Sequence, residues 1–271
     1  MFDFSGKNVV VMGGTSGINY GIACGFAKWG AKIVVASRNQ EKVDKAVAGL
    51  KELGAEAAGV SLDVRDYEAV EKGFETAVAF FGGTIDILIS GAAGNFPSRL
   101  LDMSPNGVKS VVDIDLLGTF HVMRASHQHL TKPGASVVNI SAPQAFLPMS
   151  YQSHVCAAKA GVDMVTRTLC IEWGSDGIRI NSIVPGPIDN TEGMARLTPT
   201  DDLKSALTKT VPLGRLGEVE DVANAAGLIC SDAGAYISGA ILPVDGGWSQ
   251  GGATAAMGKM AHMMDKMTGK K

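Results

Sequence analysis

Short runs rich in valine and isoleucine alternate along most of the chain with longer segments of mixed polarity. The short runs predict strands and the longer segments predict helices. Strands that are apolar on both faces and separated by helices are typical of a parallel sheet covered on both sides. The pattern therefore predicts an α/β fold: a single doubly wound domain with a parallel seven-stranded sheet. The expected strands are Asn8–Met12, Lys32–Ala36, Ala57–Leu62, Ile85–Ile89, Ser136–Ile140, Ile178–Val184 and Ala240–Val244; the expected helices are Asn19–Trp29, Gln40–Leu53, Asp66–Phe81, Val108–His129, Gln152–Trp173 and Glu218–Cys230.

No linker rich in proline and serine divides the chain, so residues 1–249 are predicted to form one domain. Residues 185–213 interrupt the alternation with four prolines and a short helical piece around Asp202–Lys209. A long insertion at this place is often a mobile substrate lid, although a purely structural excursion is the alternative. Residues 250–271 form a tail rich in glycine and methionine. Its methionines recur at helical spacing, which favours packing on a neighbouring subunit or fraying in solvent.

Composition narrows the function classes. Hydrophobic residues make up 46% of the chain and charged residues 19%, which excludes global disorder. A net charge of −3 argues against a nucleic-acid partner. The four cysteines are far apart and predict reduced, buried thiols. No signal peptide and no apolar run of about 18 residues are found, so we expect a cytoplasmic protein without a membrane partner.

A glycine-rich turn follows the first predicted strand: Gly13, Gly14 and Gly17 precede the first helix. Such a turn exposes backbone N–H groups that face a pyrophosphate at the helix N-terminus. At the first strand–helix junction of a doubly wound pattern, this is a strong indication of a dinucleotide site. The second strand ends in Ser37-Arg38, where a free ribose hydroxyl would require an acidic residue and a 2′-phosphate would require arginine. We therefore expect NADP(H), with an ordinary surface arginine as the alternative.

The turn resembles the T-G-x-x-x-G-x-G motif of the short-chain dehydrogenase/reductase family. Gly13, Gly17 and Ile18 match it, whereas Met12 replaces the threonine and Asn19 replaces the last glycine. Because asparagine tolerates positive φ, we expect the turn to survive. The resemblance covers Lys7 to about Trp248 and implies a Rossmann domain and a homo-oligomer, which is a tetramer by analogy with the family. The cofactor contacts that it implies are Gly13, Thr15, Ser16, Gly17, Ile18, Asn19, Ser37, Arg38, Asp63, Val64, Ala92, Ala93, Lys159, Pro185, Gly186, Ile188 and Thr191.

Most members of this family reduce ketones with an Asn-Ser-Tyr-Lys set. Lys159 matches the lysine, but Val155 stands at the tyrosine position, Ala142 at the serine position and Asp115 at the asparagine position. Valine cannot donate a proton and alanine cannot hydrogen-bond a carbonyl oxygen. The usual ketone chemistry is therefore excluded, and either a different reaction or a cofactor-binding protein without activity remains.

The surrounding motifs resemble the 2,4-dienoyl-CoA reductases of the family, especially the peroxisomal type. These motifs are residues 92–96, 112–120, 158–163, 172–174, 185–188 and 191–193. The resemblance implies NADPH-dependent reduction of a 2,4-dienoyl-CoA, with a water held by Asp115 and Lys159 as the proton source. Tyr151 is an alternative donor. Substrate contacts are expected from Arg65, Phe96 and Arg196.

Two other functions stay open at this point: reduction of another carbonyl substrate, or NADP(H) binding without catalysis. His154 is expected to serve packing, since helix geometry turns it away from Lys159. His121, His127 and His129 have no carboxylate or cysteine partners at metal spacing. We therefore predict no metal site.

Overall fold

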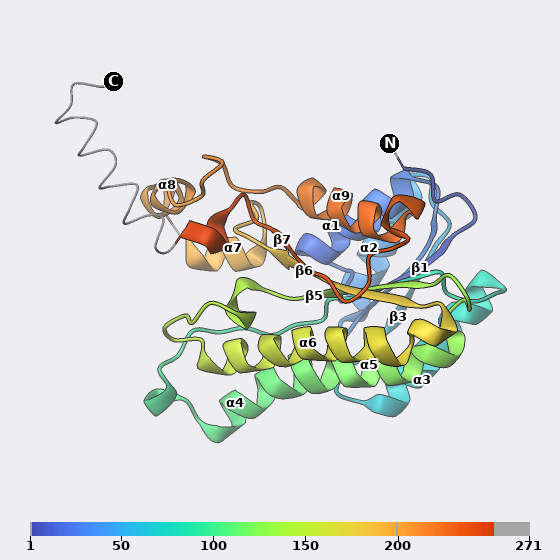
Figure 1. The fold of residues 1–271 in the computed structure, drawn as a ribbon, viewed down its shortest axis with the longest axis horizontal. Helices are drawn as coiled ribbons and strands as arrows, with labels where there is room; N and C mark the ends of the chain where they lie inside the picture. The colour runs from blue at the N-terminus through green and yellow to red at the C-terminus, as the bar shows by residue number, and fades with distance from the viewer. Residues whose placement is uncertain (1, 199, 252–271) are drawn as a thin grey trace.

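The computed structural model describes residues 2–198 and 200–251. Its seven strands form one parallel sheet in the order β3-β2-β1-β4-β5-β6-β7 (Figure 1). This order reverses direction between β1 and β4, where doubly wound sheets open a crevice for a ligand. The strands are β1 (Asn8–Met12), β2 (Lys32–Ser37), β3 (Ala57–Ser61), β4 (Ile87–Ser90), β5 (Ser136–Ile140), β6 (Arg179–Pro185) and β7 (Ile241–Val244).

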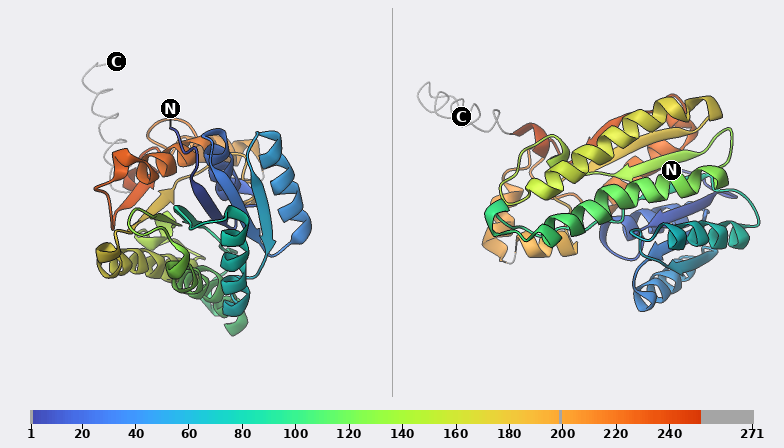
Figure 2. Two further views of the ribbon diagram at one scale, coloured as in Figure 1. Left: turned by 90° about the vertical axis from the view of Figure 1, so that its right-hand side faces the viewer. Right: turned by 90° about the horizontal axis from the view of Figure 1, so that it is seen from below.

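Helices cover both faces of the sheet and bury two apolar cores. On one face, α1 (Gly17–Lys28), α2 (Gln40–Glu52) and α9 (Val219–Cys230) pack around Phe26 and Leu50. On the other face, α3 (Tyr67–Phe81), α5 (Gly118–Ser126) and α6 (Ser153–Glu172) pack around Phe74 and Met123. Figure 2 shows α5 and α6 side by side beneath the sheet. Among the described residues, no helix is long and apolar enough to cross a membrane.

The predicted fold class is confirmed, and all seven predicted strands are present with ends shifted by two residues at most. The prediction of a single continuous helix over Val108–His129 is wrong, because the segment is divided into several helical pieces. The chain forms α4 (Pro105–Val111), a π-helical turn (Val112–Leu117), α5 and a final 3₁₀ turn (His127–His129). A π turn carries an extra residue, so it shifts the face on which the following side chains lie, and such turns are frequent at functional sites.

All four cysteines are unpaired, as predicted, but each is half-buried rather than buried. Residues 185–213 contain α7 (Glu192–Leu197) and α8 (Asp201–Thr208), which lie beyond the carboxyl end of β6. Whether they form a mobile lid stays a prediction. Most of the expected tail, residues 252–271, lies outside the described residues.

A buried polar seam fixes α6 against the sheet. The Asn139 side-chain amide of β5 donates to Thr166 Oγ1 of α6 at 2.9 Å, and the Ser182 hydroxyl of β6 lies 2.8 Å from the same oxygen. Asp163 lies one turn earlier on α6 and is also buried. These contacts set the position of α6 along the strands, and therefore the position of Lys159 at the carboxyl end of the sheet.

Burial raises the pKa of the Asp163 carboxyl above its ordinary value of 3.8, although the Ser141 and Ser182 hydroxyls act in the opposite direction. The protonated Asp163 carboxyl therefore contributes to the stability of the folded protein. This contribution is complete below the ordinary pKa of aspartate and is lost as the pH rises through the raised pKa of the folded state. Asparagine resembles the protonated carboxyl at every pH. We therefore expect Asp163→Asn to melt at or above the wild-type temperature at about pH 8, with an advantage that shrinks as the pH is lowered.

Asp221 supplies a matched control for this measurement. Its hydrogen bonds with Arg215 lower the pKa of the Asp221 carboxyl, so that the stabilisation is present above the ordinary pKa and lost as pH falls through the folded-state value. Asp221→Asn should therefore show the opposite trend, with its largest loss of stability at neutral and alkaline pH. Parallel trends for the two variants in thermal melts would refute the assignment for Asp163.

Candidate active site

The glycine-rich turn lies at the carboxyl end of β1, between β2 and β4. Gly13 and Gly17 both have positive φ, at 73° and 55°. A side chain at Gly13 would meet the backbone of Ala92 at 3.0 Å, so only glycine lets the loop after β4 approach this closely. Ala92 and Ala93 are thereby placed beside the turn, as the resemblance implies.

The N-terminus of α1 is available to an anion. Its N-cap residue, Ser16, makes no side-chain capping hydrogen bond, which leaves the first N–H groups of the helix without that partner. Thr191 stands across the turn: its methyl carbon lies 4.0 Å from the position where a Cβ of Gly17 would be. Together with Thr15 and Ile18 on the same turn, these residues fit the pyrophosphate of a dinucleotide.

We expected Asn19, which replaces a glycine of the family motif, to adopt the positive φ of that glycine, and this expectation is wrong. It lies within the first turn of α1 and does not have positive φ. Its side-chain amide instead donates to the Gly91 carbonyl oxygen at 2.7 Å. Asn19 therefore ties α1 to the loop after β4, a role that needs a side chain and that glycine could not supply.

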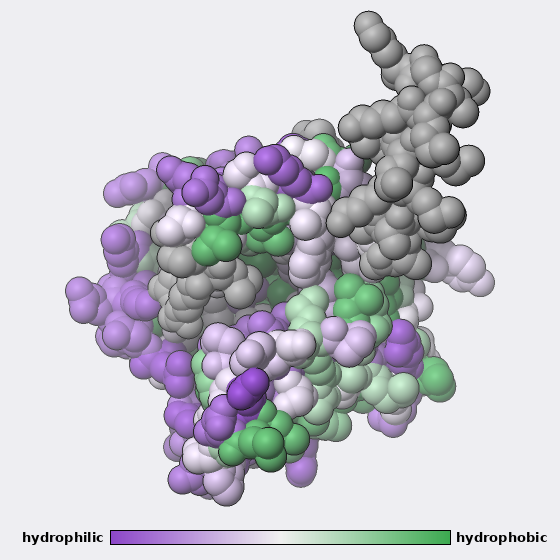
Figure 3. All heavy atoms as spheres, turned by 90° about the vertical axis from the view of Figure 1, so that its left-hand side faces the viewer, coloured by the Kyte–Doolittle hydropathy of each residue, from purple (hydrophilic) through white to green (hydrophobic). Residues whose placement is uncertain are grey.

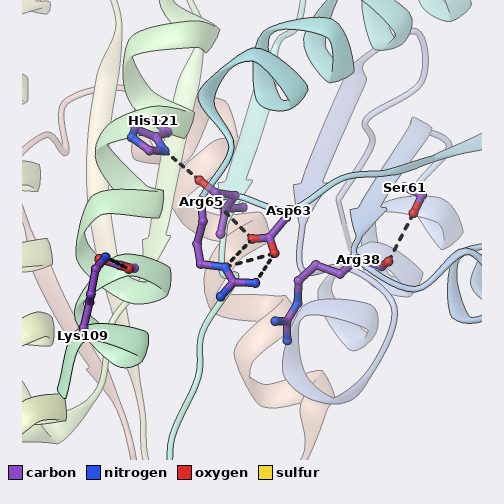
Figure 4. Close-up of polar contacts among 8 residues, drawn as sticks. Arg38, Ser61, Asp63, Arg65, Lys109 and His121 are labelled. Carbon is purple, nitrogen blue, oxygen red and sulfur yellow. Dashed lines mark hydrogen bonds and ion pairs between the residues drawn. The ribbon is translucent and has the colours of Figure 1, made fainter. Parts of the chain in front are cut away.

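Arg38 extends from the end of β2, next to Ser37, over the predicted adenosine end of the site (Figure 4). Within the described residues, its guanidinium makes no hydrogen bond or ion pair. Asp63 and Arg65, by contrast, bind each other: Arg65 donates to both carboxylate oxygens, at 2.6 to 3.1 Å. Hydrogen bonds from Arg65 hold the pKa of the Asp63 carboxyl below its usual range. The residues expected to contact adenine and CoA thus form one ion pair.

Neighbouring contacts hold the loop after β3 in place. His121 Nδ1 of α5 lies 2.9 Å from the carbonyl oxygen of Val64 (Figure 4). The side chain of Val64 packs against Gly118, where a Cβ would approach it within 2.7 Å. His121 therefore has a structural contact, and no group of metal-ligating residues occurs in the described part of the chain.

On the nicotinamide side, the segment after β6 is pinned by backbone contacts. The Gly186 N–H donates to the Val244 carbonyl oxygen at 3.0 Å, and a Cβ on Gly186 would meet the Asp245 backbone at 2.5 Å. Ile188 is buried against Gly217. The segment from Pro185 to Ile188 is therefore held by backbone contacts on both sides and lies at the carboxyl edge of the sheet.

The centre of the site is a buried ion pair. Lys159 Nζ of α6 lies 3.5 Å from Asp115 Oδ2, and the Asp115 residue is 1% exposed. The other carboxylate oxygen accepts the Gly94 N–H at 2.7 Å, and Lys159 also donates to the Ile140 carbonyl oxygen at 3.0 Å. The π turn of residues 112–117 carries Asp115 and turns it toward the loop after β4.

The wall beside this pair is apolar. Val155 is 2% exposed and packs with Val111 and Ala158. Ala142 follows β5 and brings no hydroxyl. Tyr151 is 53% exposed, and no hydrogen bond joins it to Asp115 or Lys159. The structure thus brings together Asp115 and Lys159 but not Tyr151.

Loops at this end of the sheet form an apolar mouth. Figure 3 shows this face of the molecule, where apolar side chains line part of the rim of a hollow. The exposed apolar residues of these loops are Phe96, Leu100, Leu101, Phe146 and Tyr151. Arg196 lies in α7, but its side chain is outside the described part of the structure.

Sequence reasoning missed three features of the site. It did not find the Gly94 N–H as a partner of Asp115, although Gly94 lies in the motif of residues 92–96. It did not find the π turn, because periodicity reads that turn as helix. It also missed the hydrogen bond between Gln144 and Gln152, because glutamine carries no positional signal, and it assigned His154 to packing without evidence of the ring's unpaired nitrogens.

Comparisons with known proteins agree with this geometry. A protein-family model described as "Enoyl-(Acyl carrier protein) reductase" matches residues 13–249. The peroxisomal 2,4-dienoyl-CoA reductase of Arabidopsis thaliana, named as (3E)-enoyl-CoA-producing, is 41% identical over 252 residues, which cover 89% of this chain and 84% of that protein. The peroxisomal enzyme of the same name from Saccharomyces cerevisiae is 41% identical, covering 92% of this chain and 86% of that protein.

Solved structures show the same architecture. A short chain dehydrogenase from Bacillus anthracis is 38% identical and superimposes with a TM-score of 0.81, covering 90% of this chain and 96% of the other. A dehydrogenase/reductase from Sinorhizobium meliloti is 28% identical and superimposes with a TM-score of 0.84, covering 91% of this chain and 96% of the other. Fold, glycine-rich turn and relatives therefore agree: the chain belongs to the short-chain dehydrogenase/reductase family.

Proposed function

We propose that the protein is an NADPH-dependent reductase of 2,4-dienoyl-CoA thioesters. One observation supports this most strongly: Asp115 and Lys159 form a buried ion pair beside an apolar wall, where ketone reductases of the family need tyrosine and serine. The similarity to reductases named for this reaction agrees with it. A ketone would find neither a phenol at Val155 nor a hydroxyl at Ala142.

The chemistry of a dienoyl thioester fits a site without that phenol. When bound, NADPH supplies a hydride, which adds to C5 at the far end of the conjugated system. The electron pair then moves through the conjugated bonds to the thioester oxygen and gives a dienolate. Because conjugation carries the negative charge to the thioester, no acid is needed beside C5. A proton added at C2 leaves the remaining double bond between C3 and C4 and completes the reduction.

Asp115 and Lys159 are the groups that can position the proton source. Asp115 Oδ1 is held by the Gly94 N–H and Lys159 Nζ by the Ile140 carbonyl oxygen, so neither side chain is free to swing. A water bound between the carboxylate and the ammonium would have a fixed orientation toward C2 of the dienolate. Lys159 would also hold the nicotinamide ribose, and Tyr151 is kept as the second candidate donor. A positioned proton-transfer group contributes about 10²- to 10⁴-fold to a rate.

For the cofactor, we propose NADP(H) rather than NAD(H). The support is the guanidinium of Arg38 next to Ser37, with no acidic residue at the end of β2. The pyrophosphate would lie on the turn of Thr15 to Ile18, and the adenine beside Asp63 and Val64. The nicotinamide would lie near Pro185, Gly186, Ile188 and Thr191.

For the substrate, we propose an acyl-CoA that enters over the apolar mouth at Phe96. Residues 185–213 would close over it as a lid. Arg65 and Arg196 would face the CoA phosphates, and Arg65 would then share its guanidinium with Asp63. A homotetramer is also proposed, supported by apolar side chains exposed on α5 and α6, namely Phe120, Met164 and Ile171. A cytoplasmic location stays a prediction, since the names of the relatives cited above say peroxisomal.

The direct test is a screen of NADPH oxidation with dienoyl-, enoyl- and 3-ketoacyl-CoA substrates. We expect turnover of the 2,4-dienoyl thioester and little with the ketone, because the site has no donor at positions 142 and 155. In heavy water, one solvent deuterium should appear at C2 of the product. Preferred turnover of 3-ketoacyl-CoA would contradict the proposal in favour of another carbonyl reductase. Tight NADPH binding without turnover would indicate a non-catalytic binding protein.

We expect Arg38→Ala to weaken NADPH binding much more than NADH binding. A charge-assisted bidentate contact to the 2′-phosphate is worth about 1.5–3 kcal/mol, which is roughly ten- to a hundredfold in affinity. Arg124→Ala, an exposed arginine on α5 that packs over Tyr67, serves as the control for loss of surface charge. An equal loss for both cofactors in a fluorescence titration would show that Arg38 does not recognise the phosphate.

A further inference from the structure

His154 presents buried polar atoms that the fold leaves without partners. The residue is 3% exposed and lies in the first turn of α6. Neither of its ring nitrogens has a hydrogen-bond partner within the described residues. Such groups are rare in folded proteins because each unpaired polar atom loses its hydration without compensation. An imidazole with both nitrogens unsatisfied therefore points to a partner that is not part of the chain.

The surroundings of His154 place it at the substrate mouth. Its ring centroid is 4.8 Å from that of Phe96, in the loop after β4. In the same loop, the Ser98 N–H donates to the Tyr151 carbonyl oxygen at 2.9 Å, so the loop and the start of α6 run side by side. Gly94, which binds Asp115, precedes Phe96 by two residues, a span of at most about 7 Å. His154 and Asp115 thus flank the same short segment.

A second polar group in this wall also lacks a partner. The Gln144 amide nitrogen donates to Gln152 Oε1 at 2.6 Å, while Gln144 Oε1 is buried and unsatisfied within the described residues. Gln144 comes from the loop after β5 and Gln152 from the start of α6. Two separate segments, the loop after β5 and the start of α6, therefore carry buried polar atoms without partners in the described part of the chain. Packing alone would favour apolar side chains at these positions.

The proposed reaction has a need that this wall can meet. As the dienolate forms, its charge collects on the thioester oxygen, and a fixed hydrogen-bond donor at that oxygen stabilises the transition state. Val155 and Ala142 supply no donor, and Lys159 already binds Asp115 and the Ile140 carbonyl oxygen. A neutral imidazole has one N–H donor in either tautomer, and the His154 ring packs against the Phe96 ring.

We propose that His154 donates a hydrogen bond to the thioester carbonyl oxygen of the bound acyl-CoA, with Gln144 Oε1 accepting from an amide N–H of the same substrate. The inference rests on the proposed function and adds the groups that recognise the thioester. His154 thereby takes over the support of the oxyanion that serine and tyrosine give in the ketone reductases.

The test compares His154→Phe with the matched control His129→Phe. His129 also stacks on a phenylalanine, Phe74, and has a buried unpaired Nε2, but it lies in the 3₁₀ turn after α5, at the opposite end of the sheet. We expect His154→Phe to lose roughly 10²-fold in kcat/KM on dienoyl-CoA, the usual cost of one oxyanion donor. NADPH affinity should be unchanged, and thermal stability unchanged or raised, because a buried unpaired group is removed. His129→Phe should keep wild-type kcat/KM.

Further measurements separate the possible failures. His154→Gln, which keeps an N–H donor, should recover about tenfold of the lost kcat/KM. Calorimetric binding of an enoyl-CoA to the enzyme with NADP⁺ needs no turnover, and His154→Phe should weaken it about tenfold. If wild-type protein reduces dienoyl-CoA and folded His154→Phe matches it in kcat/KM and binding, the inference is wrong while the function stands. Equal losses of melting temperature in both phenylalanine variants would also overturn it, since His154 would then be a packing residue. If the wild type acts on no CoA thioester, the proposed function fails first.

Discussion

The ion pair between Asp115 and Lys159 joins the π turn before α5 to α6 at the centre of the site. Burying two charges costs several kcal/mol for each ion, and their mutual attraction offsets this only when the remaining donors and acceptors are also satisfied. Here the backbone supplies those partners: the Gly94 N–H on one side and the Ile140 carbonyl oxygen on the other. The pair therefore requires the loop after β4, the end of β5, the π turn and α6 to be in register at once.

That requirement explains several features that are otherwise unrelated. The polar seam of Asn139, Thr166 and Ser182 keeps α6 from sliding along the sheet, so the Lys159 ammonium stays at the carboxyl edge. The π turn contains one residue more than an α-helical turn and thereby directs Asp115 toward the Lys159 ammonium. Asn19 ties α1 to the Gly91 carbonyl oxygen, so the cofactor turn and the loop that holds Asp115 are positioned together. Cofactor binding and proton delivery thus depend on one loop, residues 91–96.

The sequence was sufficient for the fold because most strands are compact runs of valine and isoleucine and the long helices between them repeat apolar residues at helical spacing. It also identified Asp115 and Lys159 as partners, since each stands at a position where the family motif has a known neighbour. It could not show how Asp115 is held, because a backbone N–H such as that of Gly94 leaves no trace in a side-chain pattern. It misjudged Asn19 for a related reason: a substitution for glycine was read as a backbone requirement, whereas the structure uses the amide as a tether. His154 was read as packing, and only its unpaired nitrogens suggest another role.

The central claim is that the Asp115–Lys159 pair positions the water that delivers the proton, and the kcat of Asp115→Ala on a dienoyl-CoA tests it most directly. With NADPH saturating, we expect kcat to fall by about 10²- to 10⁴-fold while NADPH affinity stays close to wild type. Asp115→Asn keeps an acceptor for the Gly94 N–H and therefore separates bracing of the loop from the negative charge. A stable, NADPH-binding Asp115→Ala protein with wild-type kcat would contradict the account and leave Tyr151 as the donor to test.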